Sequence, residues 1–166
     1  WLLPMAAGLP TEQKELPHAK RQFDALLDAA ADAIVVIDHK GRIENVNPAA
    51  LRMFGYERNE MVGRNVSMLM PEPFSCEHDD YLAEYMRTGH ARIIGKGREV
   101  IGLRNDGSTF PLDLSIGEVQ DSVAPRFVGI MRDISSRKEV EKALQVERDR
   151  AQGYLDLAAV ILLGLD

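Results

Sequence analysis

Cysteine is nearly missing from this sequence of 166 residues, in which Cys76 is the single example. One cysteine cannot form an internal disulfide, which indicates a reducing compartment and predicts a cytoplasmic protein. An excess of positive charge is missing too: 20 Lys and Arg stand against 26 Asp and Glu, and the formal net charge of −6 argues against a nucleic-acid-binding surface. Long apolar runs are also missing, since the stretch at 160–163 is far shorter than a membrane span. Residues 1–4 lack the basic start and apolar core of a signal peptide, so we expect no membrane partner.

The length and composition fit one globular domain with flanking segments. The hydrophobic fraction is 45% and the charged fraction is 28%, both ordinary for a domain with a single core. We expect a disordered lead-in, or an added remnant, at 1–19, where three prolines occur. The folded domain, with an N-terminal flanking helix, is predicted at 20–134. A helical linker at 135–157 and the start of a truncated further domain at 158–166 complete the chain.

The order of predicted elements indicates an α+β fold. Two β-rich runs come first, helical segments follow, and three more β-rich runs close the domain. The expected strands are 33–38, 42–46, 92–104, 108–119 and 126–134. The expected helices are 20–31, 49–54 and a longer one that follows Pro71 and Pro73 and ends at Thr88, with short turns at 56–70 between them. This order predicts a five-stranded antiparallel sheet with the helices on one face.

The tail after residue 134 has the pattern of a signalling helix. Apolar side chains recur there at alternating spacings of four and three, which is typical of a short coiled coil, although Glu147 interrupts the stripe. The stripe consists of Val140, Leu144, Ala151, Tyr154 and Ala158. The alternative is a helix packed back on its own domain. We favour a linker that forms a homodimer, together with the N-terminal helix. Residues 158–166 resemble the start of another strand, as at 33–38.

Three strings in this sequence resemble a PAS domain. They are AIVVIDHKGRIENVNPAALRMFGYERNEMVGR at 33–64, GLRNDGSTFPLDLSI at 102–116 and FVGIMRDISSRKEVEKAL at 127–144. The resemblance implies the PAS fold and a sensory role in signal transduction. It also implies that the pair Asp133-Ile134, at the end of the last strand, couples the sheet to an output helix.

The middle string, MPEPFSCEHDDYLAEYMRTGHARIIGKGREV at 70–100, is similar to the haem-binding PAS domains of FixL-type oxygen-sensing kinases. That resemblance implies b-type haem held by a histidine from the long helix, which matches His78, and a distal arginine that contacts the gas, which matches Arg98. It also implies apolar residues on the distal side, which match Ile93, Leu114 and Ile116. Family members often direct an arginine toward the haem propionates where this chain has Glu84. His90 and Arg92 are the candidates to replace it.

The residues around His78 support that assignment independently. On a helix at 74–88, residues 78, 81, 82, 85 and 86 share an apolar face, whereas Asp79 and Glu84 belong to the polar face. Neutral imidazole is a standard axial ligand of haem iron. The alternatives are a core histidine bonded to a backbone carbonyl and, for Arg98, an ordinary surface arginine. The predicted cofactor site comprises His78 as metal ligand, with Tyr81, Leu82, Tyr85, His90, Arg92, Ile93, Arg98, Leu114 and Ile116.

Two classes of function follow from this reading. One is a haem-based sensor of oxygen or another diatomic gas that controls a downstream module, a histidine kinase or otherwise a diguanylate cyclase or phosphodiesterase. The other is a cofactor-free PAS domain that dimerises and relays signals or binds an apolar metabolite. Cys76 lacks the asparagine-cysteine-arginine motif of flavin-adduct photosensors, and no nucleophile–base arrangement is present, so no catalytic site is predicted in this chain.

Overall fold

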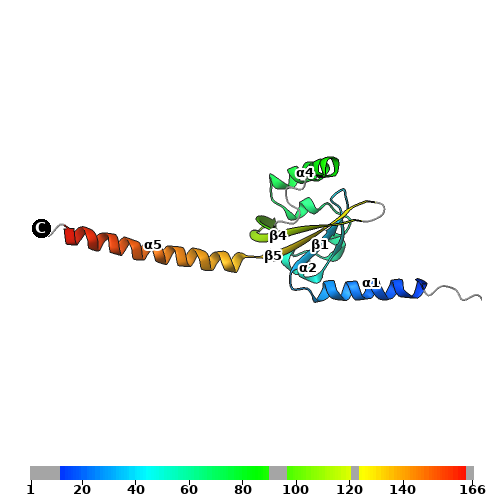
Figure 1. Ribbon diagram of the computed structural model, residues 1–166, viewed down its shortest axis with the longest axis horizontal. Helices are drawn as coiled ribbons and strands as arrows, with labels where there is room; N and C mark the ends of the chain where they lie inside the picture. The colour runs from blue at the N-terminus through cyan, green and yellow to red at the C-terminus, as the bar shows by residue number, and fades with distance from the viewer. Residues whose placement is uncertain (1–11, 90–96, 121–123, 164–166) are drawn as a thin grey trace, which may run out of the picture.

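A computed structural model describes residues 12–89, 97–120 and 124–163 (Figure 1). The elements in chain order are α1 (Glu12–Ala29), β1 (Ala33–Ile37), β2 (Ile43–Val46), α2 (Pro48–Phe54), α3 (Arg58–Met61), the 3-10 turn η1 (Val66–Leu69), α4 (Phe74–Thr88), β3 (Arg98–Leu103), β4 (Thr109–Val119), β5 (Arg126–Asp133) and α5 (Ser135–Leu163). The strands form one antiparallel sheet in the order β2-β1-β5-β4-β3. The predicted α+β fold is thereby confirmed.

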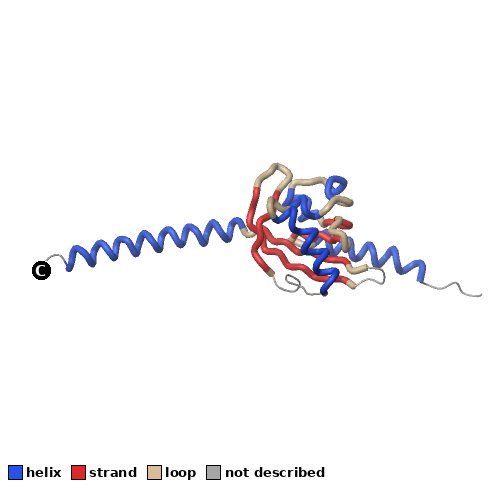
Figure 2. The backbone as a smooth tube through the Cα atoms, turned by 90° about the horizontal axis from the view of Figure 1, so that it is seen from above, coloured by secondary structure: helices blue, strands red, loops and turns tan. Residues whose placement is uncertain are grey.

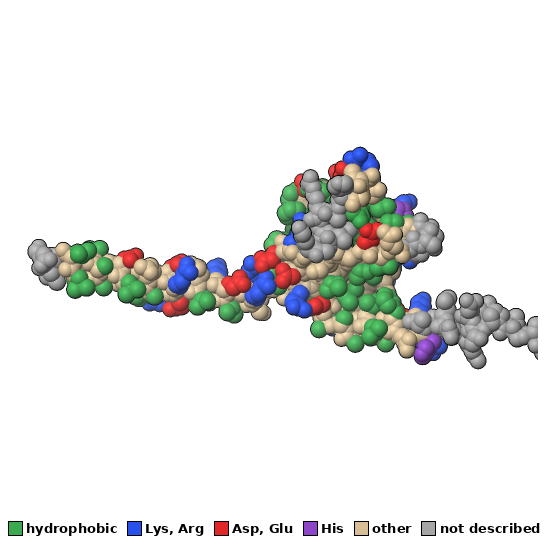
Figure 3. All heavy atoms as spheres, in the orientation of Figure 1, with side chains coloured by type: hydrophobic (Ala, Val, Ile, Leu, Met, Phe, Trp, Pro, Cys, Tyr) green, Lys and Arg blue, Asp and Glu red, His purple; other side chains and the backbone are tan. Residues whose placement is uncertain are grey.

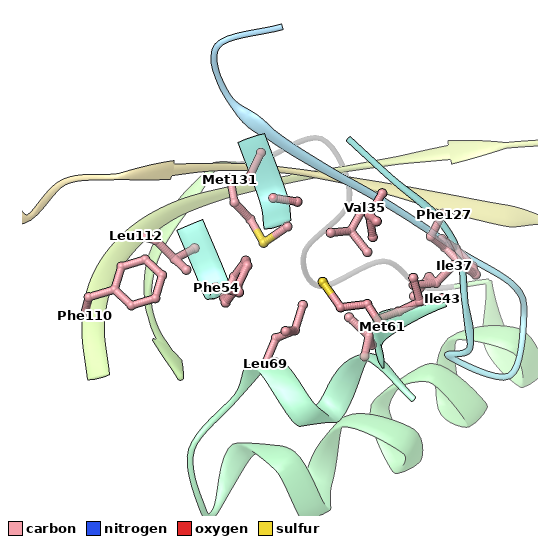
Figure 4. Close-up of a cluster of buried hydrophobic side chains, with 14 residues drawn as sticks. Val35, Ile37, Ile43, Phe54, Met61, Leu69, Phe110, Leu112, Phe127 and Met131 are labelled. Carbon is pink, nitrogen blue, oxygen red and sulfur yellow. The ribbon is translucent and has the colours of Figure 1, made fainter. Parts of the chain in front are cut away.

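The strand register places one apolar face of the sheet toward the helices. Side chains alternate across a strand, and cross-strand partners share a face. Val35 of β1 lies opposite Gly129 of β5, which lies opposite Ile116 of β4. The core on this inner face is completed by Phe54, Met61 and Leu69 from the helical segments (Figure 4). The Phe54 ring meets the Phe110 ring of β4 edge to face, with the centroids 5.6 Å apart.

One fully buried polar side chain, Asn47, joins three elements. Its Oδ1 accepts hydrogen bonds from the backbone N–H of Ile34 at 2.8 Å and of Ala50 at 3.0 Å, the latter capping α2 as the sequence predicts. Its Nδ2 donates to the backbone oxygens of Leu27 at 3.1 Å and Asp32 at 2.9 Å. The end of α1, the start of β1 and the start of α2 are therefore tied to the same amide.

The two terminal helices project from the domain in opposite directions (Figure 2). None of the residues of α5 is buried, so the alternative of a helix packed back on its own domain is wrong for this structure. No helix within the described ranges is long and apolar enough to cross a membrane.

Three element boundaries differ from the sequence predictions. α1 begins at Glu12 rather than at residue 20, so Pro17 lies within the helix and does not end it. The strand expected from Ala158 is wrong, since α5 continues to Leu163. An isolated strand would leave its backbone groups unpaired, whereas a helix pairs its own. The third difference is β3, described from Arg98 only, because residues 90–96 lie outside the described ranges.

Candidate functional site

Helix α4 is held against the domain at its first half by a carboxylate. Asp79 Oδ1 and Oδ2 accept hydrogen bonds from Asn65 Nδ2 at 2.9 and 3.1 Å, and Asn65 Oδ1 accepts from the backbone N–H of Ser67 at the start of η1. The sequence predicts Asp79 on the polar face of the helix, and its side chain is indeed 60% exposed. Its carboxylate lies beside two separate segments, the turn between β1 and β2 that contains Gly41 and the residue before η1, Asn65.

The second half of α4 is held to the sheet by Tyr85. Its hydroxyl donates to the Glu118 carboxylate of β4, and its ring meets the Phe127 ring of β5 edge to face at 5.6 Å. The hydrogen bond to Glu118 raises the pKa of Tyr85, so the phenol stays protonated as the donor. Glu118 and Phe127 are cross-strand partners, and both therefore lie on the inner face. Leu82, between the two attachments, packs against the core.

His78 directly precedes Asp79, the first of these attachments, and its side chain is 22% exposed. Its Nδ1 atom is buried and has no hydrogen-bond partner in the described part of the chain. Asp79 Oδ1 is 3.8 Å away, which is too long for a hydrogen bond. Burial lowers the pKa of His78 more than the nearby Asp79 charge raises it, so the imidazole is neutral near pH 7. The alternative of a core histidine bonded through Nδ1 to a backbone carbonyl is not what the structure contains.

The opposite wall of the candidate site is the inner face of β3 and β4. Arg98 is the cross-strand partner of Leu114, and Val100 is that of Leu112, so the Arg98 side chain leaves the sheet on the same face as Leu114. Arg98 is exposed at the very start of its strand. Leu114 and Ile116 are partly buried and pack against the core. Leu82, Leu114 and Ile116 thus each contribute apolar surface to the same core.

The apolar stripe of α4 is narrower than the sequence predicted. Tyr81 is 49% exposed and its hydroxyl donates to Glu77 at 3.0 Å, so the structure does not bring it to the inner face. Met86 is exposed as well. Side chains at the edge of an apolar helix face, here Tyr81 and Met86, stay in contact with solvent when only the middle of that face packs against the domain. Glu84 pairs with Arg87 on the surface at 2.7 Å. His90, Arg92 and Ile93 lie outside the described residues.

Three residues that position α4 were missed in the sequence. Asn65 and Asp79 gave no signal, because their contact joins residues that are 14 apart. Glu118 did give one: it continues the alternation of Leu114 and Ile116 and is thus a charged residue at an inward-facing position. A groove of about 450 Å³ was also missed. It is lined by Arg64, Asn65, Ser67, Met68, Met70, Glu72, Ser75 and Leu103, none of which was predicted as a site residue.

These residues fit a haem group. A buried, neutral imidazole with an unpartnered nitrogen is in the correct protonation state for a metal ligand. Gly129 lies at the centre of the inner face without a side chain, where an added Cβ would come within 3.7 Å of Leu114 Cδ1 and 3.8 Å of the Val35 oxygen. The side chains beside Gly129, Leu114 and Met131, are apolar, as the lining of a cofactor site usually is.

Comparison with known proteins decides the family. The PAS domain family model matches residues 31–136. The chain belongs to the PAS domain family. A relative of this PAS domain is the sensor protein FixL of Bradyrhizobium diazoefficiens, which is 41% identical over 138 residues, or 81% of this chain and 27% of that protein. Another is the cell-division control histidine kinase PdhS of Brucella ovis, which is 34% identical over 90% of this chain and 15% of that protein.

Solved PAS structures share the fold. A PAS domain of an HTR-like protein from Haloarcula marismortui has a TM-score of 0.58 and 26% identity, covering 74% of this chain and 98% of that one. An RNA-binding light-oxygen-voltage receptor has a TM-score of 0.60 and 23% identity, covering 90% of this chain and 40% of that one, which is evidence for the fold alone. The chain spans about a quarter or less of the length of its curated relatives. It is a PAS sensor domain of the kind found in sensor histidine kinases.

Proposed function

We propose that this PAS domain binds one b-type haem through His78 and senses oxygen or another diatomic gas. The observation that carries the proposal is the buried, unpartnered nitrogen of a neutral imidazole on α4, the helix whose Leu82 and Tyr85 pack against the apolar core. A buried polar atom without a partner costs about 1–3 kcal/mol, so it is retained where a ligand uses it. The haem would supply iron with an open position for the gas.

The remaining site residues have separate roles in this proposal. Leu82, Leu114 and Ile116 exclude water and lower the local dielectric. Arg98, on the inner face beside Leu114, donates hydrogen bonds to a gas that carries partial negative charge and so favours oxygen over carbon monoxide. Because Glu84 cannot attract propionates, we assign that role to His90 and Arg92 in the segment before β3. Ile93 completes the distal wall.

The proposed output is a histidine kinase joined to α5. One curated relative is named a histidine kinase, and the exposed helix α5 is the element proposed to reach such a module. We further propose that the protein is a homodimer through α5 and α1, and that α5 leads into a following domain. Val140 and Leu144 are 68% and 70% exposed, which leaves their apolar surface available to a second copy.

A hemin titration tests the ligand assignment. The wild-type chain should take up one haem and develop an intense Soret band, whereas His78→Ala should lose the band or change its ligation spectrum. His39→Ala is the matched control, since His39 lies in the turn after β1 and should leave the titration unchanged. Equal uptake with the same spectrum in wild type and His78→Ala would reject His78, and His90 would be tested next. No specific uptake by the wild type would favour the cofactor-free relay module.

A further inference from the structure

The junction between the domain and α5 is mostly polar. Ile134, which is 3% exposed, is the single apolar anchor at the start of the helix, and its N–H donates to the Pro111 oxygen at 3.1 Å. Asp133 Oδ1 accepts from the backbone N–H of Ser135 at 2.9 Å. Beyond this point no residue of α5 is buried. The direction of the helix is therefore not fixed by apolar packing.

Ion pairs fix the first turn of α5 to the outer face of the sheet. Arg137 Nη2 lies 2.6 Å from Glu99 Oε1, and Arg137 Nη1 lies 3.3 Å from Asp113 Oδ2. Lys138 Nζ lies 2.5 Å from Glu99 Oε2. Charged side chains of both signs gather where α5 leaves the domain (Figure 3). Two further contacts, from Arg137 and Lys138 to Glu141 at 3.7 and 3.8 Å, stay within the helix.

Glu99 and Asp113 share Arg137 as a counter-ion, and Asp113 also lies opposite Arg132 of β5. The two carboxylates are direct cross-strand partners on β3 and β4, an arrangement in which like charges destabilise the sheet. Arg137 contacts both carboxylates and offsets their repulsion. A change in the separation of β3 and β4 therefore changes the position that Arg137 prefers.

Glu99 also follows Arg98 directly along β3. Successive residues of a strand leave the sheet on opposite faces, so Arg98 lies on the inner face and Glu99 on the outer face. A displacement of the start of β3 moves both side chains together. The residue proposed to contact the gas and the residue that binds α5 are neighbours on one rigid strand.

We propose that Glu99 transmits the state of the site to α5: a shift of β3 caused by the ligand alters the Glu99–Arg137–Lys138 cluster and turns the helix. This inference rests on the proposed function for its trigger, but the cluster itself is testable without haem. Ion pairs at a solvent-exposed surface are individually weak, which suits a junction that must change geometry easily.

Distance measurements by electron paramagnetic resonance test the proposal. Spin labels are attached at Asn59→Cys on α3 and Arg148→Cys on α5 in a Cys76→Ser background, and labelled chains are diluted with unlabelled protein so that distances within a chain are measured. In the haem-free protein, Glu99→Gln and Arg137→Gln should broaden the distance distribution. Glu44→Gln is the matched control, since it removes an ion pair of 2.6 Å with Arg126 at the far edge of the sheet.

Two further conditions of the same distance measurement are high salt and bound haem. About 1 M salt shortens the Debye length to about 3 Å and should broaden the wild-type distribution in the same way. With haem bound, adding carbon monoxide should shift the wild-type and Glu44→Gln distances, and Glu99→Gln should lose that shift while keeping its Soret band. Unchanged distributions in Glu99→Gln and Arg137→Gln, or a gas-induced shift that persists in Glu99→Gln, would overturn the coupling. A missing Soret band in every chain would instead reject the proposed function.

Discussion

The sheet domain and helix α5 are held in place by opposite means. Within the domain, strands and helices share an inner layer of buried side chains that includes Val35, Phe54 and Met131. In α5 no residue is buried, and large apolar residues such as Leu144 and Leu162 are 70% and 73% exposed. The domain is thus stabilised by its own packing, whereas the helix needs a second surface to stabilise it. Such a helix can change its orientation without unfolding the domain.

Among the substitutions that test this comparison, Asn47→Ala should cause the largest loss of stability in the sheet domain. The substitution removes a helix cap and all four hydrogen bonds through which the buried amide joins α1, β1 and α2, so we expect a loss of about 2–4 kcal/mol in the free energy of unfolding. Urea unfolding followed by circular dichroism measures it. Asn59→Ala, at an exposed position of α3, is the control and should change little. A loss below that of an ordinary surface cap would show that the four hydrogen bonds of Asn47 are replaceable.

Asp133→Ala should have a smaller effect, at the boundary between the two regions. Asp133 accepts from Ser135 and pairs with Arg104 Nη2 at 2.7 Å, and the Arg104 guanidinium lies over the Phe110 ring at 3.7 Å. Because Asp133 is partly exposed, we expect a loss of only about 1 kcal/mol in the free energy of unfolding at neutral pH.

The effect of Asp133 should depend on pH. Partial burial by itself raises the pKa of Asp133, but hydrogen bonds from Ser135 and Arg104 outweigh it and hold the pKa below the usual 3.8. Between the folded and unfolded pKa values the unfolded chain binds more protons, so falling pH favours unfolding. The advantage of the wild type over Asp133→Ala should be complete well above pH 3.8 and decline below it. Asp80→Ala, on the exposed side of α4, is the control, and an advantage that stays constant through acid would contradict the assignment.

The sequence predicted the parts of the fold that depend on local pattern. Alternation at 108–119 located β4, and Asn47 followed by Pro48 located the start of α2, because strand faces and helix caps are set by neighbouring residues. The bonds from Asn47 to Leu27 and Asp32 could not be predicted, since they join residues 20 and 15 apart. For the same reason the contact between Tyr85 and Glu118, 33 residues apart, was not foreseen.

The candidate site was predicted only in part from the sequence. Helical spacing correctly directed His78, Leu82 and Tyr85 inward, but it could not tell where the contact line would end, so Tyr81 was wrongly included. The end of α5 shows the converse limit. Its apolar run resembles a strand, yet a strand requires a pairing partner, and no local pattern reports whether one is present.

Leu144→Asp should leave the domain unchanged and act only on association. Leu144 is 70% exposed on α5, so the free energy of unfolding of the sheet domain should change by less than about 0.5 kcal/mol. If the apolar stripe of α5 forms a parallel dimer, however, a buried carboxylate facing its own copy should weaken that dimer strongly. Light scattering at micromolar concentrations measures the association.

The control for this variant is Glu141→Gln, which lies in the same stretch of α5 but belongs to the charged side of the helix and pairs weakly with Arg137 and Lys138. It should keep the wild-type dimer. If the wild-type chain is monomeric at high micromolar concentration, the apolar stripe of α5 does not form a dimer interface. If the Leu144→Asp variant is still a dimer, the interface must instead be formed by α1 or by the outer face of the sheet. In either case the coupling through Glu99 would have to act on a helix whose apolar side chains meet some other partner.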